Sequence, residues 1–235
     1  MATTTLVSGA RAARTTIALK LAMAASGILF ILFVLAHMYG NLRAFAGHDA
    51  YNEYAAGLRT LGQPELPYSG ALWVLRVGLI LALVVHVGAA VMLTRRAQKA
   101  RPVKYVVKKN RGSSLSSRTM RWGGLTILLF LIWHLVEFTI VKVPLTSGVD
   151  KHDSYAMLVN AFSAQGGWMT FIYLLAMIAL AFHLHHGTFS ALQTLGLTNS
   201  ERSRANARAA GWAVAIVIAG GFSLVPLFTI FHVIK

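Results

Sequence analysis

Five long apolar stretches limit what this chain can fold into. They cover about residues 18–42, 71–94, 121–143, 168–192 and 210–234. A hydrocarbon layer about 30 Å thick is crossed by roughly 20 apolar residues in helical form, and each stretch is long enough. Only 12% of the residues are charged, against about 25% in an average soluble domain. The sequence predicts an all-α integral membrane protein, with five transmembrane helices in a bundle and residues 1–235 in a single membrane domain.

The distribution of basic residues predicts the orientation of this bundle. The segment 95–120 holds nine Lys and Arg residues and no acidic residue, and the segments before the first stretch and after the fourth are also basic. The segments 43–70 and 144–167 are nearly neutral. Because Lys and Arg are enriched on the cytoplasmic side, we expect a multi-pass protein of the cytoplasmic membrane with its N-terminus inside and its C-terminus outside. The net charge of +15 is then an orientation signal and does not indicate nucleic-acid binding.

Two interpretations of the basic segment 95–120 are open. Its charge would attract anionic lipid head groups, and it would also suit a cytoplasmic protein partner. The first apolar stretch is too long for a signal-peptide core and lacks a clear cleavage site, so we expect it to be retained as a transmembrane helix.

Histidine is the residue that indicates chemistry in these stretches. The chain has no cysteine, which excludes thiolate metal sites and cysteine-ligated clusters within it. Four consecutive apolar stretches each contain at least one histidine, namely His37, His86, His134 and His183. Ionisable residues inside a membrane are costly and are usually functional.

The depths of these four histidines sort them into two pairs. With a rise of about 1.5 Å per residue along alternating helices, His37 and His134 fall in the outer part of the membrane and His86 and His183 in the inner part. Two imidazoles at one depth on facing helices are the ligands that a six-coordinate haem iron requires. Two such pairs predict an electron path across the bilayer. Another metal, a proton path or plain packing are the alternatives.

Neighbouring residues leave further choices open. His183 is followed by His185 and His186, of which His186 shares roughly the same helix face and is the second candidate for an inner ligand or a contact to a haem propionate. Gly27, Gly88 and Gly187 would give room for a porphyrin, although glycine also serves helix packing in membranes.

The sequence resembles the cytochrome b membrane subunit of succinate dehydrogenase and fumarate reductase, in its diheme, five-helix, single-polypeptide form and closest to actinobacterial members. Four stretches carry the resemblance, and they are SGILFILFVLAHMYGNL (26–42), LPYSGALWVLRV (66–77), SRTMRWGG (117–124) and FHLHHGTFSALQTLG (182–196). The resemblance implies two haem b groups, a distal one on His37 and His134 and a proximal one on His86 and His183.

The resemblance also implies partners. A flavoprotein subunit with covalent FAD would oxidise succinate, and an iron–sulfur subunit would carry electrons to this anchor, which would pass them to a quinone, usually menaquinone. Both partner subunits would sit on the cytoplasmic side, and the complex could form a higher oligomer. The chain alone would not act on succinate. Some family members have a glutamate where this chain has Ala181, so we do not expect that family's proton pathway here.

The position of the quinone site follows from the family only by analogy, near the outer haem. The residues within reach are Tyr39, Asn41, Arg43, Glu53 and Tyr54, and Glu137 is a further candidate. For Glu137 the alternative is a carboxylate that reaches toward water and pairs with Lys142.

Three other functions are open. One is a haem-free or differently cofactored anchor of the same complex, and another is a cytochrome b subunit of a different quinone-linked dehydrogenase. The third is a small proton-coupled transporter, which would more often show paired carboxylates at mid-membrane or broken helices.

Overall fold

Five long helices cross the molecule from end to end in the computed structural model, which describes residues 15–100, 114–146 and 148–235. They are α2 (Thr16–Leu42), α4 (Gly70–Lys99), α5 (Leu115–Leu135), α7 (Trp168–Thr194) and α8 (Glu201–Ile230). Within the described ranges these five helices are long and apolar enough to span a membrane. The predicted all-α membrane bundle is therefore confirmed.

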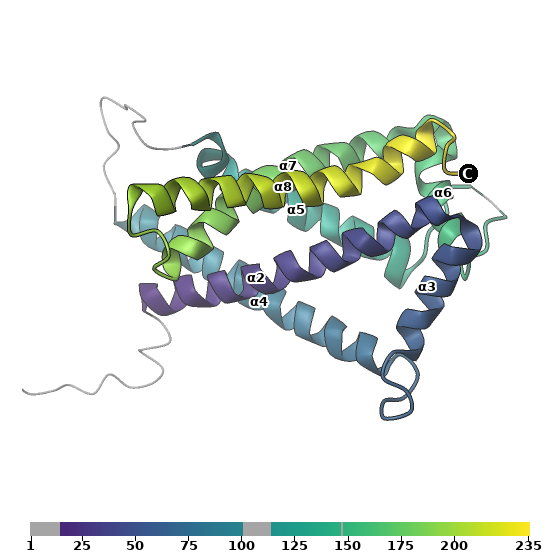
Figure 1. The fold of residues 1–235 in the computed structure, drawn as a ribbon, viewed down its shortest axis with the longest axis horizontal. Coiled ribbons are helices and arrows are strands. Elements are labelled where there is room, and N and C mark those ends of the chain that lie inside the picture. Colours follow the sequence, from purple (N-terminus) through teal and green to yellow (C-terminus); the bar gives the residue numbers. More distant parts are fainter. Residues whose placement is uncertain (1–14, 101–113, 147) are drawn as a thin grey trace, which may run out of the picture.

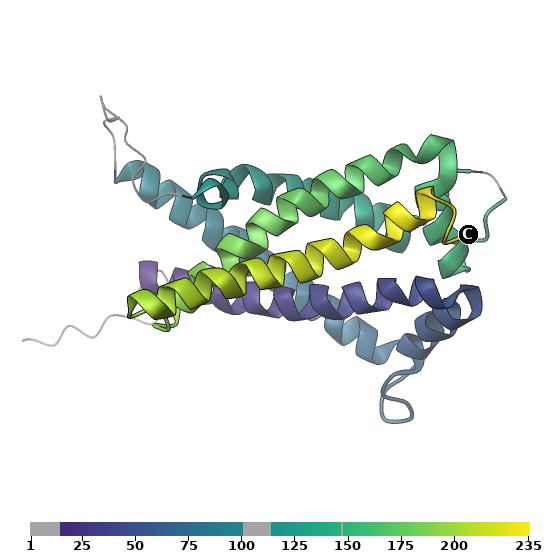
Figure 2. The same ribbon diagram turned by 45° about the horizontal axis from the view of Figure 1, so that its top comes forward.

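The helices pack in a defined order (Figures 1 and 2). Helices α7 and α8 lie side by side along most of their length, and α2 packs on both of them. Helix α5 packs on α7, and α4 packs on α2. The core between α7 and α8 contains small as well as large side chains. Ala215 and Ile218 of α8 are buried against Leu184 of α7. Small residues let helix backbones approach closely, which is the usual basis of packing inside a membrane.

Two shorter helices close one end of the bundle. They are α3 (His48–Thr60), reached from α2 through the short 3₁₀ helix η1 (Arg43–Ala46), and α6 (Ser154–Ser163), which leads through the 3₁₀ helix η3 (Ala164–Gly167) into α7. The sequence interpretation left both segments as loops, so these helices are additions to it. Phe162 of α6 is buried with Met169 and Tyr173 of α7, because a short helix at a bundle end covers apolar side chains that the long helices leave open.

A hydrogen-bonded cluster ties α3 to α6. The ring of His48 lies 2.8 Å from Asp49 through Nδ1 and 2.7 Å from Asp153 through Nε2, and Asn52 donates to Asp153 over 2.9 Å. The hydrogen bonds to Asp49 and then to Asp153 raise the pKa of His48 above its usual 6.5. Desolvation opposes ionisation of Asp153, but hydrogen bonds from Ala156, Asn52 and His48 lower its pKa to about 2. The cluster therefore places one imidazole ring between two carboxyl groups.

The third and fifth helices differ from their predicted ranges. Helix α8 begins at Glu201, nine residues before the predicted start, because Ser200 and Ser203 form a reciprocal capping box there. Helix α5 ends at Leu135 and continues as the π turn η2 (Val136–Ile140). The predicted third span ran on to residue 143.

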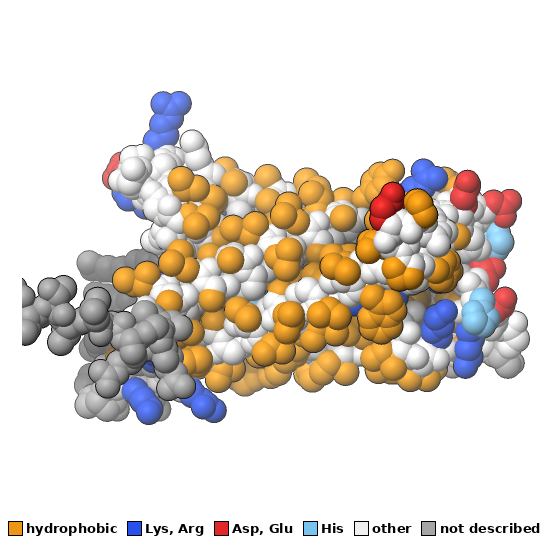
Figure 3. All heavy atoms as spheres, turned by 90° about the horizontal axis from the view of Figure 1, so that it is seen from below, with side chains coloured by type: hydrophobic (Ala, Val, Ile, Leu, Met, Phe, Trp, Pro, Cys, Tyr) orange, Lys and Arg blue, Asp and Glu red, His pale blue; other side chains and the backbone are white. Residues whose placement is uncertain are grey.

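Charged side chains gather at the two ends of an apolar surface (Figure 3). One end of the bundle carries the start of α2, the end of α4 and the starts of α5 and α8, and we call it the basic end. Its arginines are Arg95, Arg96, Arg118, Arg121, Arg202, Arg204 and Arg208. The acidic residues of α3 and of the segments beside α3 and α6 lie at the opposite end. Residues 101–113 of the predicted basic segment, and Arg11 and Arg14, lie outside the described residues. That the basic end is cytoplasmic stays a prediction.

Candidate functional site

Two histidines from α4 and α7 lie beside each other in the half of the bundle nearer the basic end. The ring centres of His86 and His183 are 6.2 Å apart, and their planes are inclined at 53°. The ring of Phe30 in α2 lies at its edge against His86, with centres 5.8 Å apart. The chain thus brings together the two histidines that were expected at the inner depth.

A second pair lies in the other half of the bundle, between α2 and α5. The ring centres of His37 and His134 are 5.8 Å apart at an angle of 77°. Phe33 stacks on His37 at 5.5 Å, and Phe138 lies 5.3 Å from His134. Apolar rings therefore line the pair, as suits a redox group inside a membrane or a packed core.

The hydrogen-bond pattern favours one tautomer for one histidine of each pair. Ser26 donates its hydroxyl proton to the carbonyl oxygen of Ala22 over 2.7 Å, so at 3.1 Å it accepts from Nδ1 of His86. Tyr173 donates to Oε2 of Glu137 over 2.7 Å, so at 3.2 Å its oxygen accepts from Nδ1 of His134. In this pattern the proton of each ring is on Nδ1 and Nε2 is unprotonated, which is the form that binds a metal.

Sequence reasoning did not single out Ser26 or Tyr173 as site residues. Both are polar side chains within an apolar stretch, and that is the signal that could have identified them. Their partners on other helices depend on the rotation of each helix, which the sequence pattern does not give.

The spacing within each pair suits a metal ion between the rings. A metal lies about 2 Å from each imidazole nitrogen, and each nitrogen lies about 1.1 Å from its ring centre, so the centres would be about 6 Å apart. The observed separations are 6.2 Å and 5.8 Å. Within the described part of the chain, no three His, Cys, Asp or Glu residues gather as a metal site by themselves. The donor sets are therefore pairs of imidazoles, which a macrocycle-bound iron can use.

Glycines face both rings of the inner pair. A Cβ at Gly27 would lie 3.5 Å from Cε1 of His86, and one at Gly124 would lie 3.6 Å from Cε1 of His183. Of the three glycines named from the sequence, Gly27 alone lies against a histidine ring, since the space beside Gly88 and Gly187 is open.

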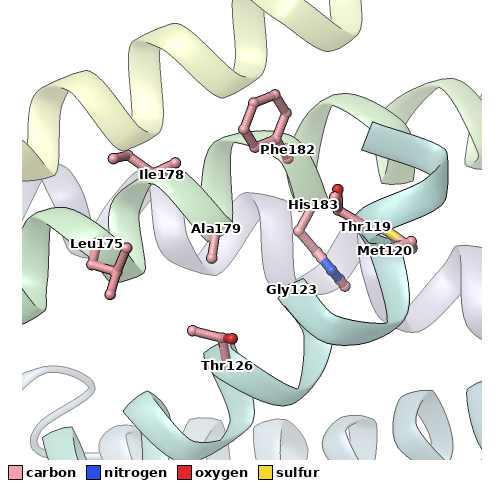
Figure 4. A pocket seen from close by; sticks show the side chains of 9 residues that line it. All are labelled: Thr119, Met120, Gly123, Thr126, Leu175, Ile178, Ala179, Phe182 and His183. Carbon is pink, nitrogen blue, oxygen red and sulfur yellow. The ribbon is translucent and has the colours of Figure 1, made fainter. Parts of the chain in front are cut away.

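An apolar cavity of about 210 Å³ adjoins His183 between α5 and α7 (Figure 4). Gly123 and Ala179 lie on its two facing walls, and His183 points from α7 toward α5. Nδ1 of His183 is buried and makes no hydrogen bond. The small side chains and the unpaired ring nitrogen suit a flat apolar group beside this histidine.

The other two histidines of α7 have different surroundings. His185 is buried, its Nδ1 lies 2.9 Å from the hydroxyl of Ser116, and its ring stacks on Trp212 with centres 4.2 Å apart. These contacts explain His185 as a packing residue between α5, α7 and α8. The ring beside His86 is that of His183, whereas His186, three residues further along α7, is half-buried.

Glu137 is fully buried in the π turn η2, where it accepts the hydrogen bond from Tyr173. Its other oxygen, Oε1, is buried without a hydrogen bond of ordinary geometry. The alternative interpretation of Glu137, a carboxylate paired with Lys142 near water, is wrong. The amino group of Lys142 instead donates to the carbonyl oxygen of Lys151 over 3.0 Å.

Five of the residues proposed for quinone contact belong to the end of α2, the 3₁₀ helix η1 and the helix α3. The rings of Tyr39 and Tyr54 meet edge to face with centres 6.2 Å apart. Asn41 lies 3.5 Å from Nε2 of His37 through its side-chain nitrogen. Nε of Arg43 is buried without a hydrogen bond, while Glu53 is exposed.

Comparison with known proteins gives one family. No significant match was found among curated proteins or among solved structures. The model of the succinate dehydrogenase/fumarate reductase transmembrane subunit family matches residues 94–223, which is more than half of the chain and includes His134 and His183. The chain therefore belongs to this family, and its apolar helices are those of a membrane anchor subunit of a succinate/fumarate:quinone oxidoreductase.

Proposed function

We propose that the chain is a diheme cytochrome b anchor, which carries electrons between an iron–sulfur partner subunit and menaquinone in the cytoplasmic membrane. His86 and His183 would hold the proximal haem b, and His37 and His134 the distal one. The observation that carries the proposal is the pair of ring separations, 6.2 Å and 5.8 Å. When bound, haem b supplies one-electron redox chemistry.

Neighbouring side chains would orient the histidines of both sites for binding haem. Ser26 and Tyr173 hold the ring protons of His86 and His134 on Nδ1, which leaves Nε2 of each ring for iron. Gly27 and Gly124 keep side chains away from the inner rings. Phe33 and Phe138 pack against the outer rings. Their apolar side chains lower the local dielectric constant, so the iron's charge would be less screened there.

The basic end supports the proposed place of the partners. Within the described residues, Glu201 is the acidic residue at this end, against seven arginines. An iron–sulfur subunit docked there would meet the inner histidine pair first. The iron–sulfur clusters would belong to a partner subunit, because this chain has no cysteine to hold them, and FAD would belong to the flavoprotein subunit.

The quinone would bind at the opposite end, near the outer pair. The side-chain nitrogen of Asn41 lies 3.5 Å from Nε2 of His37, the rings of Tyr39 and Tyr54 meet edge to face, and Glu53 is exposed on α3. Arg43 follows α2 directly and is the basic residue of this group. Reduction of a quinone takes two protons as well as two electrons, which favours a site near water. Glu137 stays a further candidate for quinone protons, because Tyr173 links its carboxyl group to His134 of the outer pair.

The test is a haem count per chain on the purified complex, by the pyridine haemochrome assay. We expect two haem b in the wild type, partly reducible by succinate, and one in His183→Ala. His185→Ala is the matched control, since it removes another histidine of α7 whose contacts are Ser116 and Trp212, and it should keep two. Full haem content in His183→Ala would refute the pairing. A wild type without haem would favour the haem-free anchor.

A further inference from the structure

A hydrogen-bonded chain of three side chains runs through the bundle beside the outer histidine pair. Tyr173 of α7 donates to Oε2 of Glu137 over 2.7 Å, and the same hydroxyl oxygen lies 3.2 Å from Nδ1 of His134. Glu137 is 0% exposed and Tyr173 is 7% exposed. A carboxyl group enclosed in this way is costly inside a membrane and is usually functional.

A π turn in the backbone places Glu137 within reach of Tyr173. The turn that holds it is a π turn, in which the N–H of Val141 donates to the carbonyl oxygen of Val136 five residues earlier. The N–H of Val143 then donates to the carbonyl oxygen of Glu137 over 3.0 Å. Such single wide turns are rare within helices and are frequent at functional sites.

With Glu137 ionised, the direction of the hydrogen bonds places each proton. A tyrosine hydroxyl has one proton, and here it goes to Glu137. The oxygen of Tyr173 must then accept the proton on Nδ1 of His134, which leaves Nε2 of this ring as the free lone pair. The carboxyl group thereby acts on the imidazole through the tyrosine, and a hydrogen bond of this kind raises the basicity of a metal-binding histidine.

The inner pair has a weaker counterpart. Ser26 accepts from Nδ1 of His86 at 3.1 Å, but its own proton goes to a backbone carbonyl oxygen of the same helix. No described carboxyl group hydrogen-bonds to Ser26. The two pairs therefore differ in one respect: a carboxyl group is linked to the outer histidine His134 through a hydroxyl, and no described one is linked to the inner histidine His86.

We propose that Tyr173 and Glu137 are positioning residues for His134, which fix its tautomer and ring orientation and make it a more electron-rich ligand of the outer haem. This inference rests on the proposed diheme function. An electron-rich ligand stabilises the oxidised iron, so the pair lowers the midpoint potential of the outer haem. Loss of the hydrogen bond should raise that potential, while the inner haem keeps its own.

The experiment uses the purified complex with its partner subunits and bound haem. Haem content is counted first, and each haem is then titrated optically against potential and examined by electron paramagnetic resonance, whose g values respond to ligand orientation. The variants are Tyr173→Phe, which removes the hydroxyl, and Glu137→Gln, which keeps an acceptor and removes the charge. Tyr155→Phe is the control, because this tyrosine is equally buried but donates to the carbonyl oxygen of Lys235.

We expect Tyr173→Phe to shift the reduction equilibrium of the outer haem by roughly tenfold, equal to about 59 mV for one electron. Glu137→Gln should produce a smaller shift in the same direction, and Tyr155→Phe none. Outer-haem potential and g values unchanged in Tyr173→Phe would overturn the proposal. If that variant does not assemble, an unchanged potential in Glu137→Gln overturns it instead. A wild type without the outer haem would refute the proposed function itself.

Discussion

Gly211 of α8 faces the backbone of α7 so closely that no side chain fits between the two helices. A Cβ built at this position would lie 2.6 Å from the carbonyl oxygen of His185, below the 3.0 Å that such contacts reach in practice. The obstacle is backbone, so a change of rotamer cannot relieve it. In Gly211→Ala the helices must separate by at least about 0.4 Å at this point.

The cost of that separation can be isolated with a second variant in the same helix. Overpacking typically costs about 1–3 kcal/mol. Gly220, also within α8, has nothing within 4 Å of its Cβ position, and Gly220→Ala therefore carries the same gain in helix propensity, about 1 kcal/mol, without the clash. The difference in unfolding free energy between the two variants should be about 1–3 kcal/mol in favour of Gly220→Ala.

Thermal unfolding of the two variants in the same detergent, followed by circular dichroism, measures this difference. Tryptophan fluorescence is a local readout, because Trp212 stacks on His185 next to the contact. We expect the lower midpoint for Gly211→Ala. Equal midpoints, or a more stable Gly211→Ala, would show that α7 and α8 are not in the close contact from which the reasoning starts.

Two further predictions concern the ends of the bundle. Because the pKa of His48 is raised above 6.5 in the folded state, its link to Asp153 should stabilise fully below pH 6.5 and be lost as the pH rises through the folded value. The difference in unfolding midpoint between wild type and His48→Gln should therefore narrow at alkaline pH, and a constant difference would contradict this. At the basic end, the double change Arg118→Glu and Arg121→Glu should reduce co-purification of the partner subunits, whereas Arg59→Glu at the opposite end should not; equal recovery would place the partners elsewhere.

The sequence predicted the five spans because hydropathy is a local property. A run of about 20 apolar residues has few stable alternatives to a helix across the membrane, and α4 and α7 fall close to their expected ranges. The expectation that the histidines meet in two pairs used only the regular rise of a helix. Their roles as ligands stay a prediction.

Helices α3 and α6 were missed for a physical reason. They are short, and they pack against segments far along the chain or on other helices, as Phe162 of α6 does with Tyr173 of α7. Asp153 caps α6 and also binds His48 across a gap of 105 positions. The composition of either segment does not predict such a contact.

Residue order along single helices is enough to predict a membrane bundle with histidines at two depths. Which side chains hydrogen-bond to those histidines depends on contacts between helices. Ser26 meets His86, and Tyr173 links His134 to Glu137. These contacts depend on how far each helix is rotated about its axis and on one π turn, and both are set by packing between helices.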